Sequence, residues 1–247
     1  MKKLYIYIVL TVQLCVCLFF VSAHAADVDL ITQENIKGST AYEDGIIDFK
    51  ARKAMYSADG SMLELRDDVE FRTSDGVSLQ TQAITWDQQT DLVSSKERVT
   101  INRAVPEVNI KGRGLEARTG LRTVTLEDEV EVVIPQEDSM YIVITCEGTL
   151  EVRYEEGLAV FNKDVRVSQK DSELYTDKAI VYFDSANKLL DRIEAQGNVR
   201  IVRGKDTSYA NTAVYYAAEK RIVLEGRPRL VIFPESEGDE LKTEWNI

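Results

Sequence analysis

Clusters of acidic residues are the part of this sequence whose residue types and spacing could do chemistry. The clusters are Asp67 with Asp68, residues 127–129 (Glu-Asp-Glu), and Glu155 with Glu156. Paired carboxylates can serve as general acid and as nucleophile or base in glycoside hydrolysis. Each cluster, however, stands beside an alternating apolar run, at a place where we expect a turn before a strand. Solvation of a turn explains acidic residues there, and we expect no catalysis from them.

Histidine and cysteine are almost absent from the chain. The only histidine is His24, and two of the three cysteines are Cys15 and Cys17, so residue 26 onwards has no histidine and a single cysteine, Cys146. This leaves no imidazole for a Ser or Cys triad and no Cys/His cluster for zinc. We expect Cys146 to be a buried small hydrophobe. The net charge of −12 argues against a nucleic-acid partner. We therefore predict a protein that is not an enzyme, with no catalytic residue, no metal and no cofactor.

Residues 1–25 have the pattern of an export signal. Lys2 and Lys3 precede an almost wholly apolar run over residues 4–21, and "AHA" at residues 23–25 offers small residues at a cleavage site. The apolar run is also long enough to reach the lower limit of a membrane span. Two interpretations stay open, a cleaved signal peptide or a retained N-terminal membrane anchor. Both place the rest of the chain outside the inner membrane.

Beyond residue 38 the sequence consists of short alternating runs. Examples are "VEFRT" at residues 69–73 and "VRIVR" at residues 199–203. Period-two runs rich in β-branched residues, interrupted by Asp, Gly, Lys and Ser, are typical of antiparallel strands. No stretch in this region keeps a helical period, so the pattern predicts an all-β fold.

These strands recur as a unit. In three copies a valine is followed by an apolar or aromatic residue at +10 and by alanine at +14, and the valines are Val69, Val165 and Val199. Weaker copies start near Val99, Val130 and Pro228, which gives a spacing of 29–35 residues. Because one two-stranded hairpin is at best marginally stable in water, about six such repeats are expected to stack and share a core.

The chain also has a candidate internal boundary. In "VIPQEDSMY" at residues 133–141, Pro135 is expected to end a strand and acidic residues follow. We therefore predict two β modules, at residues 38–134 and 141–233, and an acidic tail at residues 234–247.

The repeat phrase "IEAQGNVRIVRGKDTSYANTAVYY" at residues 193–216 resembles the OstA-like modules of lipopolysaccharide transport. This family includes the periplasmic bridge component LptA, the membrane-anchored component LptC and the N-terminal domain of the translocon LptD. The second module is similar to LptA. The first module is more similar to the membrane-anchored component LptC, which begins with a membrane helix.

This resemblance implies a twisted, open β-jellyroll of antiparallel strands in the periplasm. Its apolar groove would shelter the lipid A acyl chains of lipopolysaccharide and pass them from an inner-membrane ABC transporter toward the outer membrane. Burial of each methylene would contribute about 0.8 kcal/mol. Modules of this kind join head to tail through their edge strands. The alternative is a periplasmic or surface protein that binds carbohydrate or serves as a structural β-repeat.

The groove candidates are the apolar and aromatic residues at matching places in the repeats, although the pattern leaves open which strand face points inward. They are Val69, Phe71, Ile84, Trp86, Val99, Ile101, Val130, Val132, Val165, Val167, Ile180, Tyr182, Val199, Ile201, Val214 and Tyr216. The candidate edge for a partner is the strand "RLVIF" at residues 229–233, with Leu230, Val231 and Ile232 at its centre.

Overall fold

The computed structural model describes residues 31–42, 45–118, 123–136, 140–184 and 189–232. These residues form fifteen β-strands, which confirms the all-β prediction. The same residues contain no helix, and hence none long and apolar enough to cross a membrane. The predicted export signal and the predicted acidic tail lie outside the described residues.

Most strands are long for a globular protein, and they follow one another with short connections. In chain order they are β1 (Ile31–Tyr42), β2 (Gly45–Tyr56), β3 (Met62–Thr73), β4 (Val77–Asp87), β5 (Leu92–Ala104), β6 (Glu107–Arg118), β7 (Thr123–Pro135), β8 (Tyr141–Cys146), β9 (Leu150–Arg153), β10 (Leu158–Gln169), β11 (Ser172–Phe183), β12 (Leu190–Arg203), β13 (Asp206–Tyr216), β14 (Arg221–Glu225) and β15 (Arg229–Val231).

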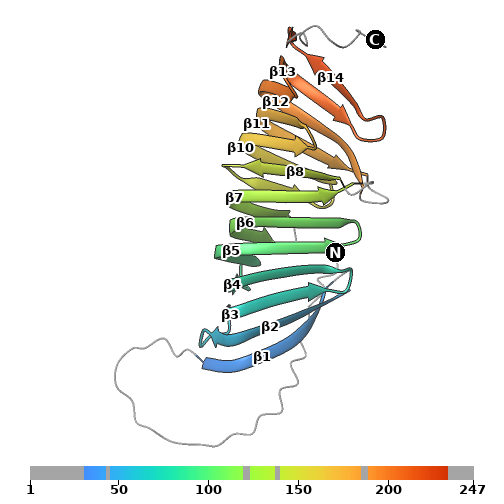
Figure 1. Ribbon diagram of the computed structural model, residues 1–247. Coiled ribbons are helices and arrows are strands. Elements are labelled where there is room, and N and C mark those ends of the chain that lie inside the picture. Colours follow the sequence, from blue (N-terminus) through green and yellow to red (C-terminus); the bar gives the residue numbers. More distant parts are fainter. Residues whose placement is uncertain (1–30, 43–44, 119–122, 137–139, 185–188, 233–247) are drawn as a thin grey trace, which may run out of the picture.

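All fifteen strands belong to one antiparallel sheet. From β1 to β7 and from β10 to β13 consecutive strands pair with each other, so the strands stack in chain order from β1 at one end to β14 at the other (Figure 1). Two positions in the stack are each filled by two short strands. β8 and β9 both lie between β7 and β10, and β14 and β15 both pair with β13.

The long strands bend near their middle. Between β3 and β4, for example, the pairing shifts between Arg66 and Val69, and between β12 and β13 it shifts between Gln196 and Val199. Such bulges bend a strand and increase its twist. Because nearly every pair of long strands has one, the sheet is folded lengthwise into two walls that face each other across the core. The first wall contains residues 69–73, 99–104, 107–111, 130–135, 141–146 and 165–169, and the second contains residues 63–66, 92–95, 113–118, 123–126, 150–153 and 158–162.

The bulges explain two of the acidic clusters. Asp67 and Asp68 lie inside β3 at the bend, with φ of 62° and 55°, and Glu129 lies inside β7 with φ of 51°. Left-handed backbone at a bend favours Asp, Asn and Gly. These acids therefore occupy corners within strands, not the turns before strands that we expected. Glu155 and Glu156 do lie in a turn, between β9 and β10.

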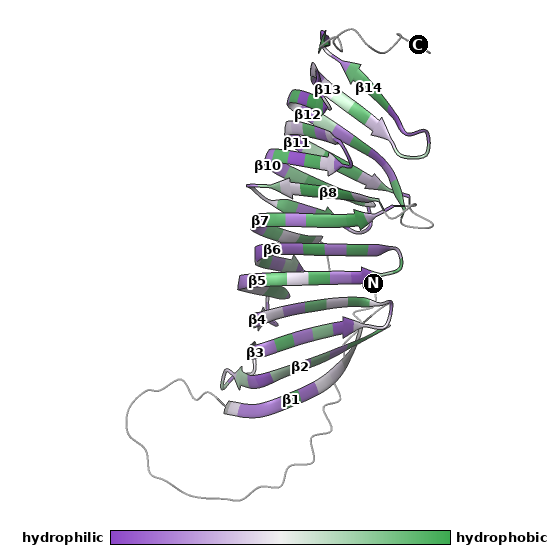
Figure 2. Cartoon of the chain, in the orientation of Figure 1, coloured by the Kyte–Doolittle hydropathy of each residue, from purple (hydrophilic) through white to green (hydrophobic). Residues whose placement is uncertain are grey.

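One large apolar core fills the space between the walls. It extends from Ala51 in β2 to Ile193 in β12, and its largest fully buried side chains include Phe161, Leu65 and Ile142. Hydrophobic and hydrophilic residues alternate along the strands, as Figure 2 shows. Cys146 is part of this core, and burial raises the pKa of its thiol above the ordinary value.

The core becomes thinner toward the C-terminal end. A separate small cluster there consists of Ala195, Val199, Ala210 and Ala213. Alanine buries less apolar area than leucine or phenylalanine, so this end gains less from the hydrophobic effect.

The stack has an open edge at each end. β1 begins at Ile31, ahead of residue 38 where the first repeat was expected, and pairs only with β2 among the described strands. At the other end, β15 pairs only with β13 within the described ranges and stops at Val231, whereas residue 233, the predicted strand end, lies outside them. Leu230, Val231 and Ile232 are 53%, 43% and 52% exposed. Unpaired edges of this kind can take another strand.

Candidate functional site

An apolar cavity of about 140 Å³ lies between the two walls near the middle of the stack. Aliphatic side chains from both walls line it, together with the aromatic rings of Phe161 and Phe183. On the side of the first wall are Val77, Ile101, Val108, Ile110, Val132, Ile134 and Ile144, and on the side of the second are Leu150, Val152, Leu158, Ala159, Phe161, Val181 and Phe183. The cavity is therefore a space suited to hydrocarbon.

Polar residues occur only at the rim of this cavity's lining. Arg103 is at the end of β5, Arg153 ends β9, and Tyr154 is in the turn that follows β9. The Arg103 guanidinium carbon lies 5.7 Å from the centre of the Tyr154 ring. Because Arg103 and Tyr154 belong to opposite walls and both lie at strand ends, this cation–π contact joins the walls at one end of the cavity, which we call its mouth.

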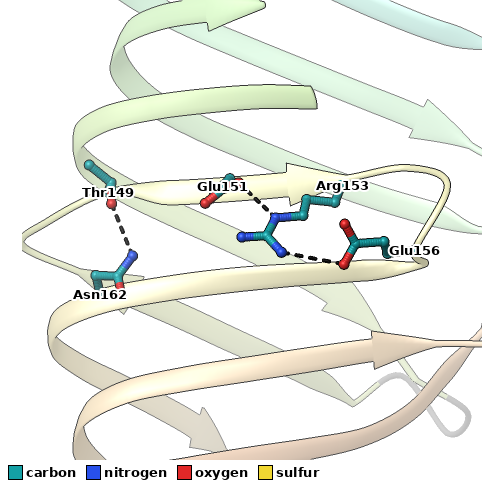
Figure 3. Close-up of polar contacts among 5 residues, drawn as sticks. All are labelled: Thr149, Glu151, Arg153, Glu156 and Asn162. Atoms are coloured by element: carbon teal, nitrogen blue, oxygen red, sulfur yellow. Dashed lines mark hydrogen bonds and ion pairs between the residues drawn. The ribbon is translucent and has the colours of Figure 1, made fainter. Parts of the chain in front are cut away.

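The two arginines have different polar partners. Arg153 donates through Nε to Glu151 at 2.7 Å and through a terminal nitrogen to Glu156 at 3.3 Å (Figure 3). These contacts raise the pKa of Arg153, and the hydrogen bond from Arg153 lowers the pKa of Glu151. Arg103 donates through Nε to the backbone carbonyl of Val105 at 3.1 Å, and no carboxylate in the described part of the chain pairs with it.

Most of the groove candidates lie on the side of the core. Ile84 and the valines that begin the repeats are buried, and aromatic or aliphatic residues two positions further pack against the same core. The candidates on this side are Val69, Phe71, Ile84, Trp86, Val99, Ile101, Val130, Val132, Val165, Val167, Val199 and Ile201.

Four candidates lie on the opposite face of their strands: Ile180, Tyr182, Val214 and Tyr216. Their neighbours Ala179, Val181 and Ala213 are at most 1% exposed, and successive side chains of a strand point to opposite faces. Tyr182 lies against Arg192, whose guanidinium carbon is 3.7 Å from the ring centre, and Tyr216 lies against Arg221 in the same way at 4.8 Å.

The difference comes from the length of one hairpin loop. Val69 pairs with Thr81, twelve residues later, whereas Val165 pairs with Thr176, eleven residues later. Residues at the same distance from Val69 and from Val165 in the sequence therefore stand one place apart in the sheet. A shift of one residue along a strand moves a side chain to the other face. In the structure Ile84 corresponds to Ala179, not to Ile180.

Sequence reasoning missed several residues of the cavity. Val181 and Phe183 continue the inward alternation from Ala179, so the pattern "AIVYF" at residues 179–183 contained the signal in its other register. The pairing of Arg103 with Tyr154 left no signal in the sequence, because only the fold brings the ends of β5 and β9 together. One core-side candidate carries an unusual feature: the buried indole Nε1 of Trp86 has no hydrogen-bond partner among the residues that the structure describes.

Fold and site together define an elongated antiparallel β-repeat protein with an apolar interior and open strand edges. Two family models match such a chain. Residues 26–135 match a model described as lipopolysaccharide-assembly, LptC-related, and residues 148–244 match a model described as LptA/(LptD N-terminal domain) LPS transport protein. Together they cover most of the chain, which belongs to the lipopolysaccharide-transport proteins, and these families are non-enzymatic transport modules. No curated protein matches the chain closely enough to count as a relative.

Proposed function

We propose that this protein shelters the acyl chains of lipopolysaccharide between its two walls and passes them across the periplasm. The observation that carries the proposal is the apolar cavity between the walls, which is lined by residues of both matched regions. Burial of each methylene in such a space is worth about 0.8 kcal/mol. Binding of this kind needs no catalytic group, in keeping with the transport families to which the chain belongs.

The proposed orientation uses both edges of the stack. The N-terminal end, preceded by the cleaved or retained export segment, would face the inner-membrane ABC transporter. The exposed edge at Leu230, Val231 and Ile232 would pair with the next β module on the way to the outer membrane. Residues 38–134 and 141–233 would then act as LptC-like and LptA-like modules that share one groove.

The outer surface disfavours the alternative of a carbohydrate-binding protein. Flat sugar-binding surfaces need aromatic faces that are free to stack, but arginine guanidinium groups lie over the rings of Tyr175, Tyr182, Tyr209 and Tyr216. At each of these four rings an arginine therefore already occupies a face on which a sugar could stack.

Site-specific photo-crosslinking can test the proposal with two neighbouring positions. A photoreactive phenylalanine at Phe183 would face the cavity, and the same group at Tyr182 would face outward from the same strand. We expect lipopolysaccharide to crosslink strongly from position 183 and weakly from position 182. Equal capture from both positions, or from neither, would contradict a binding groove between the walls.

A further inference from the structure

The cavity crosses the junction between the two matched regions. Ile101 and Val132 belong to residues 26–135, whereas Leu150, Phe161 and Val181 belong to residues 148–244. The two regions adjoin in the sheet, because β7 of the first region pairs directly with β9 of the second. A ligand that moves along the groove from one region to the other must pass this cavity and its mouth.

The Arg103–Tyr154 contact joins the same two regions across that mouth. Arg103 comes from the LptC-related region and Tyr154 from the LptA-like region. A cavity of similar volume in another protein accommodates a single benzene molecule. With the mouth bridged, the space of about 140 Å³ therefore holds the end of one hydrocarbon chain and not a complete lipid.

Arg103 is the arginine of the cavity lining that forms no ion pair with a carboxylate of the described residues. Arg153, which lines the same cavity, is held by Glu151 and Glu156. Arg103 has one hydrogen bond to a backbone carbonyl and the ring of Tyr154, and no ion pair with any described residue. A cation beside an apolar space complements an amphiphile that has an anionic head and a hydrocarbon chain. The net charge of the protein acts against this only weakly, because charges further away than about 8–10 Å are screened by salt.

We propose that Arg103 binds the phosphate group of an anionic amphiphile whose acyl chain occupies the cavity, and that Tyr154 leaves Arg103 when this happens. This rests on the proposed function of the groove. A charge-assisted hydrogen bond between guanidinium and phosphate is stronger than a partly exposed cation–π contact. When an anionic head group is present, phosphate replaces Tyr154 as the partner of Arg103, and the contact that closes the mouth of the cavity is lost. Without an anionic head group the Arg103–Tyr154 contact stays in place. The junction between the two regions then admits phosphorylated amphiphiles in preference to neutral ones.

Displacement of a neutral apolar dye, N-phenyl-1-naphthylamine, from the purified full chain would test this. The competitors are dodecyl phosphate and dodecyl maltoside, both below their critical micelle concentrations, and inorganic phosphate. We expect the wild type to prefer dodecyl phosphate, and Arg103→Gln to bind it roughly tenfold to a hundredfold more weakly, with dodecyl maltoside unchanged. Arg103→Lys should retain part of the preference, and inorganic phosphate alone should displace no dye.

Two further variants control the test. Arg98→Gln removes the same charge from the same strand, at an exposed side chain that pairs with Glu129, and should leave the preference intact. Tyr154→Ala should bind dodecyl phosphate at least as tightly as the wild type and take up the dye faster. Equal affinity of Arg103→Gln and the wild type for dodecyl phosphate would overturn the role of Arg103, and unchanged dye uptake by Tyr154→Ala would overturn the role of Tyr154. A wild type that binds neither dye nor amphiphile would instead overturn the proposed function itself.

Discussion

Glu70 is the one acidic side chain that is buried in the described part of the chain. It is 7% exposed, lies on the face of β3 opposite Val69, and pairs with Lys50 and Arg72. The hydrogen bond from Lys50 and the contacts with Arg72 hold the pKa of Glu70 below its ordinary value, although burial acts in the other direction. Because the folded-state pKa of Glu70 is lowered, the contacts of its carboxylate with Lys50 and Arg72 stabilise the protein above the unfolded-state pKa. This stabilisation is lost as pH falls through the folded-state pKa.

Glu70→Gln should therefore reduce the free energy of unfolding more at pH 7 than at acidic pH. We expect a loss of about 1–3 kcal/mol at pH 7, because hydrogen bonds to two charged groups are weakened. The difference should shrink as pH falls below the ordinary pKa of 4.5, and the two proteins should converge below the lowered folded-state pKa, where the wild-type carboxyl is protonated too. Urea unfolding followed at pH 7, 5 and 3.5 would measure this. A difference that stays constant over that range would show that Glu70 contributes through packing and not through its charge.

Single residues also show how far the sequence could predict the groove. The buried repeat valines, such as Val69 and Val165, are placed correctly by alternation, because a strand with one buried face must keep its apolar residues on one side. Ile180 is as apolar as Val181, and Tyr182 has a large apolar ring beside its hydroxyl, so composition could not choose between the two faces of β11. The choice depends on the hairpin loops, because the β3–β4 loop is one residue longer than the β10–β11 loop. It also depends on Arg192 and Glu194, which contact Tyr182 on the outer face of the sheet.

The strands themselves follow from the sequence more fully than their bends do. Period-two runs gave the right secondary structure from β3 to β13, but nothing in those runs indicates that one strand continues through a corner. The corners depend on residues such as Asp68, Asp164 and Asn198, whose positive φ is visible only in the backbone. In the sequence the same residues resemble turns, and each bent strand therefore resembles two short ones.

β15 allows a test of the proposed joining edge. All three of its residues are exposed, and it pairs with β13 at three positions only. Deletion of residues 227–247 should leave the core unchanged, and the unfolding midpoint in urea should shift little. The truncated protein should still bind lipopolysaccharide but should no longer form head-to-tail assemblies, which size-exclusion chromatography with light scattering would detect. If the truncated chain unfolds, β15 is part of the core. If it assembles as before, the joining edge lies elsewhere.

The whole molecule is a stack in which each strand contacts mainly its neighbours, and this arrangement makes stability local. In repeat structures the free energy is close to a sum over units and their interfaces, so different parts can open independently. The junction between the LptC-related and LptA-like regions lies in the middle of the largest core cluster, where β7, β8, β9 and β10 meet. The two regions are therefore joined inside the main buried core, which keeps the proposed groove continuous through the junction.

The C-terminal part of the stack should have a lower free energy of local opening than the N-terminal part, even in strands that do not lie at the edge. The buried apolar residues of the β12–β13 pair are Ile193, Ala195, Val199, Ala210 and Ala213, whereas the β3–β4 pair, at a comparable distance from the other end, has Leu63, Leu65, Val69 and Ile84. Each leucine or isoleucine in place of alanine buries more apolar area, and full burial of such a side chain is worth about 1.5–3 kcal/mol.

Amide hydrogen exchange would measure this gradient directly. We expect the paired amides of β12 and β13 to exchange at least about tenfold faster than those of β3 and β4, since a difference of 1.4 kcal/mol in opening free energy corresponds to a factor of ten. The amides of β7 and β10, at the junction, should exchange slowest. Addition of lipopolysaccharide should slow exchange most where acyl chains fill space that small side chains leave open, in β12 and β13. Uniform exchange rates along the stack would contradict local stability and show instead that the sheet unfolds as one cooperative unit.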